Sequence, residues 1–256
     1  MDFTTIPAVS AVLDGIASFV EAIGGALEPF TGSWAPLLAI VVLTFVVRLA
    51  LLPVGISQVR AERTRRRLAP ELAALRRRYA KQPEALNRAL VELYRSHGAS
   101  PVAGCLPLLA QAPVLSAVYA LFVHQEIAGH ANALLAAVVG GVPLGANLFH
   151  LLGTTITAIW PFLVVLALLG LAIELTRRAS ARWAGSTTEV TGTESAAAAG
   201  TRALAPVLRW LPFLSVVFAA IVPFAAGVYL ATSALWTVAE RAILRRVLIG
   251  RPELTA

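Results

Sequence analysis

Charged residues are scarce in this chain. Of its 256 residues, 14% are charged and 58% are hydrophobic, and the mean hydropathy is +0.76. A soluble globular domain carries about 25% charged residues, so the composition argues against that class and predicts several membrane spans. Cysteine occurs once, at Cys105, so no disulfide can form within the chain, and we interpret this residue as inert packing.

Lysine and arginine are absent from the first 30 residues. A secretory signal begins with a positively charged region, so we do not expect a cleaved signal here. Acidic residues recur instead at seven-residue spacing, at Asp14, Glu21 and Glu28, opposite an apolar stripe. The stripe consists of Val9, Val12, Leu13, Ile16, Phe19, Val20, Ile23 and Leu27. This pattern predicts an amphipathic helix over 1–33 that lies in the membrane interface; the alternative is a short helix packed on an extracytoplasmic protein surface.

Groupings of catalytic residues are also missing. The stretch HQEIAGH at 124–130 lacks the H-E-x-x-H spacing that places two zinc-binding histidines on one helix face. There is no G-x-S-x-G motif and no pair of carboxylates inside an apolar stretch. We therefore expect no enzymatic activity, no cofactor and no metal.

Apolar runs of about 20 residues, the length that crosses a bilayer, are abundant. Five of them predict an all-α, polytopic membrane protein with an N-terminal amphipathic helix and a cytoplasmic helical hairpin. The residues 131–149 are also apolar, but Gly140, Gly141, Pro143 and Gly145 interrupt them. A re-entrant or surface segment therefore suits this stretch better than a sixth span.

The positions of Lys and Arg give the orientation. Of the 21 basic residues, eleven lie in 60–95, five in 177–209 and four in 241–251, and the last is Arg48. With five spans and an extracytoplasmic N-terminus, all except Arg48 fall on the cytoplasmic side, as the positive-inside rule requires. We expect the plasma membrane as the location, with the C-terminus in the cytoplasm. The resulting division is an extracytoplasmic amphipathic helix 1–33, spans 34–55, 101–123, 155–176, 204–221 and 224–244, a cytoplasmic hairpin 56–100, an extracytoplasmic loop 124–154, a flexible cytoplasmic loop 177–203 and a cytoplasmic tail 245–256.

The hairpin and the final pair of spans are marked by proline. Leucines recur at helical spacing on both sides of Lys81–Pro83, and Pro83 suits the first position of a new helix. The two apolar stripes are expected to face each other. Retention on the cytoplasmic side and attraction to anionic headgroups account for the arginine runs better than nucleic-acid binding does. The stretch Ile221–Gly227 supplies proline and glycine for a turn between the last two spans.

One arginine interrupts the first span. Arg48 stands within LTFVVRLALLP, five to nine residues before the expected interface at 53–57, which is about 8–13 Å at ~1.5 Å per residue. Such residues usually face a bundle interior or a wet cavity; the alternative is an arginine that snorkels to lipid phosphates. Polar residues that would complete a hydrophilic groove around Arg48 are Thr44, Gln111, Ser116, Tyr119, Thr232 and Ser233.

Three stretches resemble the YidC family of membrane protein insertases, particularly its five-span Gram-positive type. They are VVRLALLPVGISQ, the run LAPELAALRRRYAKQPEALNRALVELYRSHGASPVAGCLPLLAQAPVLSAVYALF, and the late VPFAAGVYLATSALW. The first two cover about 80 residues nearly continuously. By motif, Arg48 matches the family's arginine in a groove that opens to the cytoplasm and to lipid.

The resemblance implies a chaperone that moves membrane proteins into the bilayer without ATP or a cofactor. Its expected partners are substrate membrane proteins and lipids, with the ribosome and the Sec translocon as further candidates. Two departures predict a less polar groove: Tyr229 is followed by Leu230 where relatives have Tyr-Trp, and Leu171 or a neighbour replaces a polar glutamine. The short tail after Arg246 argues against tail-mediated ribosome docking.

Two other classes of function remain open. A small-solute or ion transporter would need a polar path to the outside and shows internal repeats in many folds, and neither is evident in the sequence. A membrane-tethered scaffold that binds the ribosome or nucleic acid through the basic hairpin would show steeply salt-dependent binding.

Overall fold

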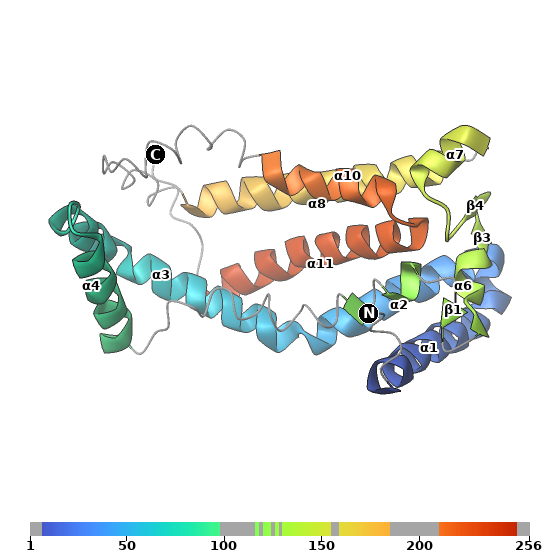
Figure 1. Ribbon diagram of the computed structural model, residues 1–256, viewed down its shortest axis with the longest axis horizontal. Helices are drawn as coiled ribbons and strands as arrows, with labels where there is room; N and C mark the ends of the chain where they lie inside the picture. Colours follow the sequence, from blue (N-terminus) through green and yellow to red (C-terminus); the bar gives the residue numbers. More distant parts are fainter. Residues whose placement is uncertain are drawn as a thin grey trace. The chain divides into compact units, whose positions relative to one another are not determined.

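The computed structural model describes residues 7–97, 116–117, 120–123, 126–127, 130–154, 159–184 and 210–249 (Figure 1). These residues are mainly helical, as the all-α prediction requires. The helices are α1 (Pro7–Thr31), η2 (Gly32–Trp34), α2 (Ala35–Ala50), α3 (Leu52–Arg78), α4 (Pro83–Ser96), α6 (Ala133–Ala136), α7 (Leu148–Thr154), α8 (Trp160–Ala184), η6 (Leu211–Phe213), α10 (Leu214–Ile221) and α11 (Phe224–Leu248). The strands are β1 (Glu126–Ile127), β2 (His130–Ala131), β3 (Val138–Val139) and β4 (Val142–Pro143).

The chain divides into two compact units. The first comprises Met1–Leu51, Ala110–Glu174 and Phe213–Val238, and contains the main apolar cluster. The second comprises Leu52–Leu109, Leu175–Pro212 and Ala239–Ala256, and contains α3, α4 and the last turns of α11.

The amphipathic stripe at the N-terminus folds into α1, which packs on α2. Leu13 and Val20, on the apolar side of α1, are 3% and 1% exposed and belong to the main cluster, while Asp14 and Glu21 are exposed. Gly32 then turns the chain with φ +54°, a conformation that costs glycine little because it lacks a Cβ. Part of the apolar stripe of α1 is therefore buried against other elements of the first unit.

The first apolar helix ends earlier than the sequence pattern suggests. The range 34–55 was predicted as one span, but α2 ends at Ala50 and α3 begins at Leu52. Pro53 explains the position of this break: proline has no amide hydrogen to donate, so it is tolerated in the first turn of a helix and disfavoured further inside. The predicted hairpin helix is correspondingly longer, because α3 runs without interruption to Arg78.

The helices α3 and α4 contact each other, and α4 begins at Pro83. Glu84 lies in the first turn of α4, where a negative charge interacts favourably with the helix dipole. Near the other end, Nε2 of His97 is 3.9 Å from Oε1 of Glu71 on α3.

The segment 130–154 consists of short elements, none of which has the length of a membrane-spanning helix. Strands β3 and β4 pair across Gly140 and Gly141, whose φ angles are +58° and +85°. Positive φ at both central residues fits the type I′ turn, whose twist matches that of the flanking strands. The all-α prediction missed this hairpin and the β1–β2 pair.

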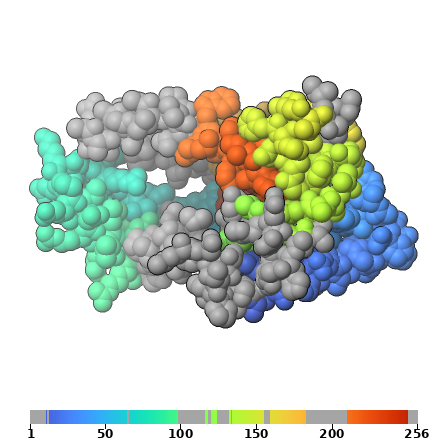
Figure 2. Space-filling view, turned by 45° about the vertical axis from the view of Figure 1, so that its right-hand side comes forward, coloured from blue at the N-terminus to red at the C-terminus, as the bar shows by residue number. Residues whose placement is uncertain are grey.

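This segment also caps the start of α11. The amide groups of Phe224 and Ala225 donate to the carbonyl oxygens of Ala146 and Leu144 at 2.8 and 2.9 Å. The first amides of a helix have no partner within it, so the segment satisfies two donors that would otherwise need water. Figure 2 shows residues 130–154, in yellow-green, packed against the blue N-terminal helices and the orange C-terminal ones.

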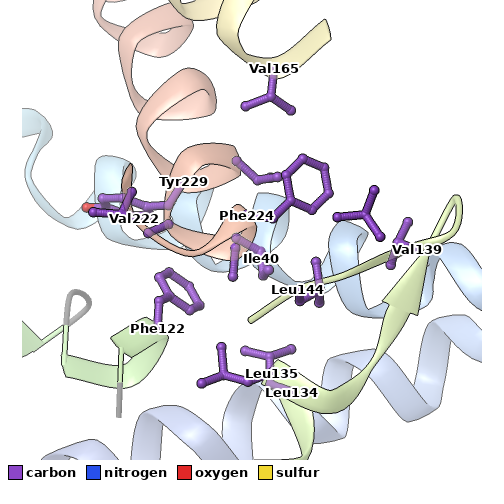
Figure 3. Packing of buried hydrophobic residues seen from close by; sticks show 14 of the residues in the cluster. Ile40, Phe122, Leu134, Leu135, Val139, Leu144, Val165, Val222, Phe224 and Tyr229 are labelled. Atoms are coloured by element: carbon purple, nitrogen blue, oxygen red, sulfur yellow. The ribbon is translucent and has the colours of Figure 1, made fainter. Parts of the chain in front are cut away.

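The core of the first unit lies where α2, α11 and the 130–154 segment meet (Figure 3). Ile40 and Phe224 are fully buried, and the rings of Phe224 and Phe162 lie 5.2 Å apart. Phe122 and Tyr229 form a second ring pair with centroids 6.2 Å apart. The ring pairs join α11 to α8 and to Phe122, and Ile40 of α2 belongs to the same buried cluster.

Two described segments are long and apolar enough to cross a membrane: Leu13–Ala50 and Trp160–Arg182. They overlap the predicted first and third spans. Leu211–Ile221 is a shorter apolar helix in the predicted fourth span. The second predicted span, 101–123, lies largely outside the described residues.

The turn before α11 falls between the predicted spans 204–221 and 224–244. The interruption is limited to Val222 and Pro223, and Gly227 lies inside α11. A Cβ at Gly227 would stand 3.6 Å from Cγ1 of Val165 and 3.8 Å from the carbonyl oxygen of Ala219. The glycine therefore lies in the packed interior and does not form the turn.

Candidate functional site

Arg48 contacts α11 through its guanidinium group. It lies in the last turn of α2, and its Nε donates a hydrogen bond to Oγ of Ser233 at 2.8 Å. The Nη2 group of Arg48 donates to the same oxygen. The arginine side chain thus points from one apolar helix to another, as expected for an intramembrane arginine that faces a helix bundle.

Ser233 is a buried acceptor. It is 5% exposed and lies on α11. Tyr229, one helical turn earlier and 4% exposed, forms a side-chain hydrogen bond with Ser233. Arg48, Ser233 and Tyr229 therefore form one polar cluster inside an apolar environment, which we call the Arg48 cluster.

An aromatic pair joins the same two helices. Phe45, one turn before Arg48, lies edge-on to Trp236 with ring centroids 5.4 Å apart. Such pairs contribute about 0.5–1.5 kcal/mol beyond the area they bury. The pair supports the geometry that brings Arg48 to Ser233.

Thr44 is fully buried, one turn before Arg48 on α2. Its Oγ1 donates to the carbonyl oxygen of Ile40 at 2.7 Å. This bond lies within its own helix, a common way for threonine to satisfy its hydroxyl in an apolar helix. Thr44 therefore stands beside the Arg48 cluster with its hydroxyl hydrogen directed to the backbone.

Four predicted site residues remain: Thr232, Ser116, Gln111 and Tyr119. Thr232 is half-buried next to Ser233 in the sequence, and the side chain of Ser116 is exposed. Gln111 and Tyr119 lie outside the described residues. Of the seven predicted residues, the structure thus joins Arg48 and Ser233 by a direct bond.

Tyr229 was not among the predicted site residues. It was noted only because Leu230 follows it. The signal that identifies it is its spacing: Tyr229 precedes Ser233 by four residues on α11, and residues four apart lie on the same helix face.

The chemistry available in this cluster is that of a fixed positive charge. Arginine stays protonated in proteins, carries five N–H donors and has no acceptor. Within the part of the chain that the structure describes, no group of three or more His, Cys, Asp and Glu residues could hold a metal ion. The cluster suits the recognition of negative or hydrogen-bond-accepting groups.

Comparison with known families supports this assignment of the fold. Residues 26–251 match the model of a family described as the 60Kd inner membrane protein. The chain belongs to this family. The match includes the whole Arg48 cluster and both compact units except for the ends of the chain.

Individual relatives of this family carry the name membrane protein insertase YidC. A protein from Clostridium perfringens is 40% identical over 85 residues, which are 33% of this chain and 36% of the relative. YidC 2 of Bacillus anthracis is 39% identical over 98 residues, covering 36% of this chain and 38% of the relative. A protein from Helicobacter pylori is 25% identical over 264 residues, which cover 100% of this chain and 42% of the relative.

The chain spans less than half the length of each of these relatives. Family membership and the long apolar helices make the chain a membrane protein of the cell membrane.

Proposed function

We propose that this chain is a membrane protein insertase and chaperone. It receives newly made membrane proteins from the cytoplasm and lets their apolar segments enter the bilayer beside a hydrophilic groove that contains Arg48. The observation that carries the proposal is the Arg48 cluster, a permanent positive charge held inside apolar helices by Ser233. The names of the relatives in the 60Kd inner membrane protein family support it.

The physical task of such a protein is to lower a desolvation barrier. A short acidic tail on a substrate loses its hydration when it enters hydrocarbon, which is very costly for an isolated charge. A half-buried guanidinium in the inner leaflet would offer that tail a partner part-way across. This step requires neither covalent chemistry nor ATP, so we propose a function that is not enzymatic, with substrate membrane proteins and lipids as the partners.

The groove is proposed to open to the cytoplasm and to lipid, with Thr44, Gln111, Ser116, Tyr119 and Thr232 contributing to its polarity beside the Arg48 cluster. The hairpin of α3 and α4 would be the element that first meets a substrate, the ribosome or the Sec translocon.

The membrane topology that fits this function has five spans, an extracytoplasmic N-terminus and a cytoplasmic C-terminus. Support comes from the 21 basic residues: apart from Arg48, each would lie in a cytoplasmic segment or, as Arg209 and Arg241 do, near the cytoplasmic end of a span. Two exposed serines give a matched test: Ser33 before α2 and Ser96 at the end of α4. In a chain with Cys105→Ser, Ser33→Cys should react with an impermeant maleimide in intact cells, and Ser96→Cys only after permeabilisation. The reverse pattern would overturn the proposed orientation.

The function itself is tested by insertion of a single-span substrate with a short acidic N-terminal tail into vesicles that carry this protein. Arg48→Ala should abolish insertion, and Arg48→Lys should retain most of it because the charge remains. Arg88→Ala is the matched control, since Arg88 pairs with Glu84 on the surface of α4, with side chains that are 84% and 90% exposed. If the wild-type protein inserts nothing, or if Arg48→Ala inserts as well as wild type across several substrates, the proposal is wrong.

A further inference from the structure

The start of α3 and the end of α11 lie in close contact within the second unit. Gly55 lies against the side chain of Glu240: a Cβ at position 55 would overlap Oε1 of Glu240 and stand 2.8 Å from its Cδ. Val59, one turn further along α3, is 3% exposed. The glycine therefore leaves room for the Glu240 carboxylate beside α3.

Two turns beyond Gly55, an ion pair connects the same helices. Nε of Arg245 donates to Oε2 of Glu62 at 3.1 Å, and the Arg245 and Glu62 side chains are 6% and 28% exposed. The other carboxylate oxygen of Glu62 accepts from Nη2 of Arg66 at 2.6 Å, within α3. The pair is thus largely buried, and both oxygens of Glu62 are engaged.

Burial decides how much this ion pair can matter. Glu84 and Arg88 on α4 are separated by 3.7 Å, and both side chains are nearly fully exposed. An exposed pair of that kind contributes little, because water and salt screen it. Removing one partner of a largely buried pair deletes a charge-assisted hydrogen bond that water screens little, so it costs more than the loss of an exposed pair.

The order of the contacts gives the direction of the two helices. From Gly55 to Glu62 the chain advances along α3, and from Glu240 to Arg245 it advances along α11. The two helices therefore run parallel through this joint. Arg63 to Arg78 of α3 and the whole of α4 follow the joint in the chain, so their anchoring to α11 depends on it.

We infer that Glu62 and Arg245 are a positioning pair, which fixes the base of the α3–α4 hairpin to the end of α11 while the protein accepts a substrate. This inference rests on the proposed insertase function, with α4 and the outer turns of α3 as the parts that meet the substrate. The pair does not itself touch the substrate. It acts by keeping the hairpin attached to the last apolar helix.

Hydrogen exchange of the full-length protein in lipid nanodiscs tests the anchor directly. In Glu62→Gln or Arg245→Gln, amides of residues 56–66 should exchange about tenfold faster, because the first turns of α3 open more often. The swapped variant, Glu62→Arg with Arg245→Glu and with Arg66→Ala to remove the like charge one turn from position 62, should recover most of the protection. Glu84→Gln, the exposed counterpart on α4, should leave these amides unchanged.

Insertion of the acidic-tailed substrate by the same variants tests the positioning role. Both single variants should insert several-fold less than wild type, and the swapped variant should recover. Arg48→Ala should lose insertion while residues 56–66 keep wild-type exchange, which separates the joint from the Arg48 cluster.

Three results would overturn the inference. Unchanged exchange in both single variants would show that the pair does not hold α3. Faster amide exchange together with insertion at the wild-type rate would show that the pair stabilises the two helices but has no positioning role in insertion. A swapped variant that stays as defective as the single variants would show that the charges do not act as a pair. If the wild-type protein inserts nothing, the proposed function fails together with the positioning role, and the exchange data still report whether the joint exists.

Discussion

Replacing Ser233 with alanine removes the acceptor that holds Arg48. The Nε and Nη2 groups of Arg48 both donate to Oγ of Ser233. Ser233 is 5% exposed, so bulk water cannot take the place of the hydroxyl unless the helices separate. The variant therefore removes an acceptor that two donor groups of a charged side chain share.

The magnitude follows from the charge of the donor. Hydrogen bonds to charged groups contribute about 1.5–3 kcal/mol, roughly twice the value for neutral pairs. We expect Ser233→Ala to lower the free energy of unfolding by about 2 kcal/mol. This value lies in the lower half of the range because Arg48 can partly rearrange in the variant. This loss is a change of about 30-fold in the unfolding equilibrium constant. Equilibrium unfolding in mixed detergent micelles, followed by tryptophan fluorescence, measures it.

Ser233→Asp separates the position of Arg48 from its charge. A carboxylate at this place can accept two hydrogen bonds from the guanidinium, so stability should stay close to that of wild type. The same carboxylate cancels the positive charge that an acidic substrate tail would meet, so insertion should fall at least tenfold, by roughly the 1.4 kcal/mol that a tenfold change represents. Ser57→Asp is the control for an added carboxylate, because Ser57 is exposed on α3 and is not one of the proposed groove residues.

Two results would refute this reasoning. If Ser233→Ala unfolds like wild type while Thr232→Ala does not, the hydrogen bond from Arg48 to Ser233 does not stabilise the protein. If Ser233→Asp folds and inserts substrates at the wild-type rate, the charge of Arg48 is not the property that insertion uses.

Three further predictions concern the neighbouring contacts. Thr44→Val should lower stability by no more than about 1 kcal/mol and reduce insertion far less than Arg48→Ala does, because the hydroxyl hydrogen bonds to its own helix; a loss of insertion as large as that of Arg48→Ala would give Thr44 a direct role. A double-mutant cycle of Phe45→Ala and Trp236→Ala should give a coupling energy of about 0.5–1.5 kcal/mol in micelle unfolding, and a value near zero would contradict the ring contact. Gly55→Ala should be close to neutral in thermal unfolding, since displacement of the Glu240 carboxylate offsets the helix propensity of alanine. In a Glu240→Ala background the same change should stabilise by up to about 1 kcal/mol, and no gain there would rule out the overlap as the cause.

The sequence predicted the helical elements where local chemistry decides them. Pro83 begins α4, and the acidic face of α1 is exposed, as periodicity alone suggested. Local rules were less successful at breaks, because a proline does not always end a helix. At Pro53 the helix restarts just before the proline, so the ring occupies a first turn, while Pro70 lies inside α3. Which proline ends a helix depends on the packing around it.

The β3–β4 hairpin and the packing of Gly227 show a second limit. Gly140 and Gly141 were interpreted as interruptions of an apolar run, which is correct, but their pairing into a tight turn depends on the strands on both sides. Gly227 was assigned to a turn from its nearness to Pro223, whereas it lies in α11 against Val165. A glycine signals either a turn or a close contact, and only the tertiary structure distinguishes them.

The polar residues of the apolar helices differ in whether their hydrogen-bond partner lies on the same helix or on another one. Thr44 donates to the carbonyl of Ile40, and Thr237 donates to the carbonyl of Ser233, so each threonine is satisfied by the helix that carries it. Such residues add little to the cost of an apolar environment and carry little information about a site. Arginine cannot be satisfied in this way at the same depth, because its five donors and its charge exceed what one helix turn offers. Arg48 therefore needs a partner on another helix, and Ser233 on α11 is that partner. In a chain of this composition, a polar residue whose partner lies on a different helix is the strongest indication of a working site.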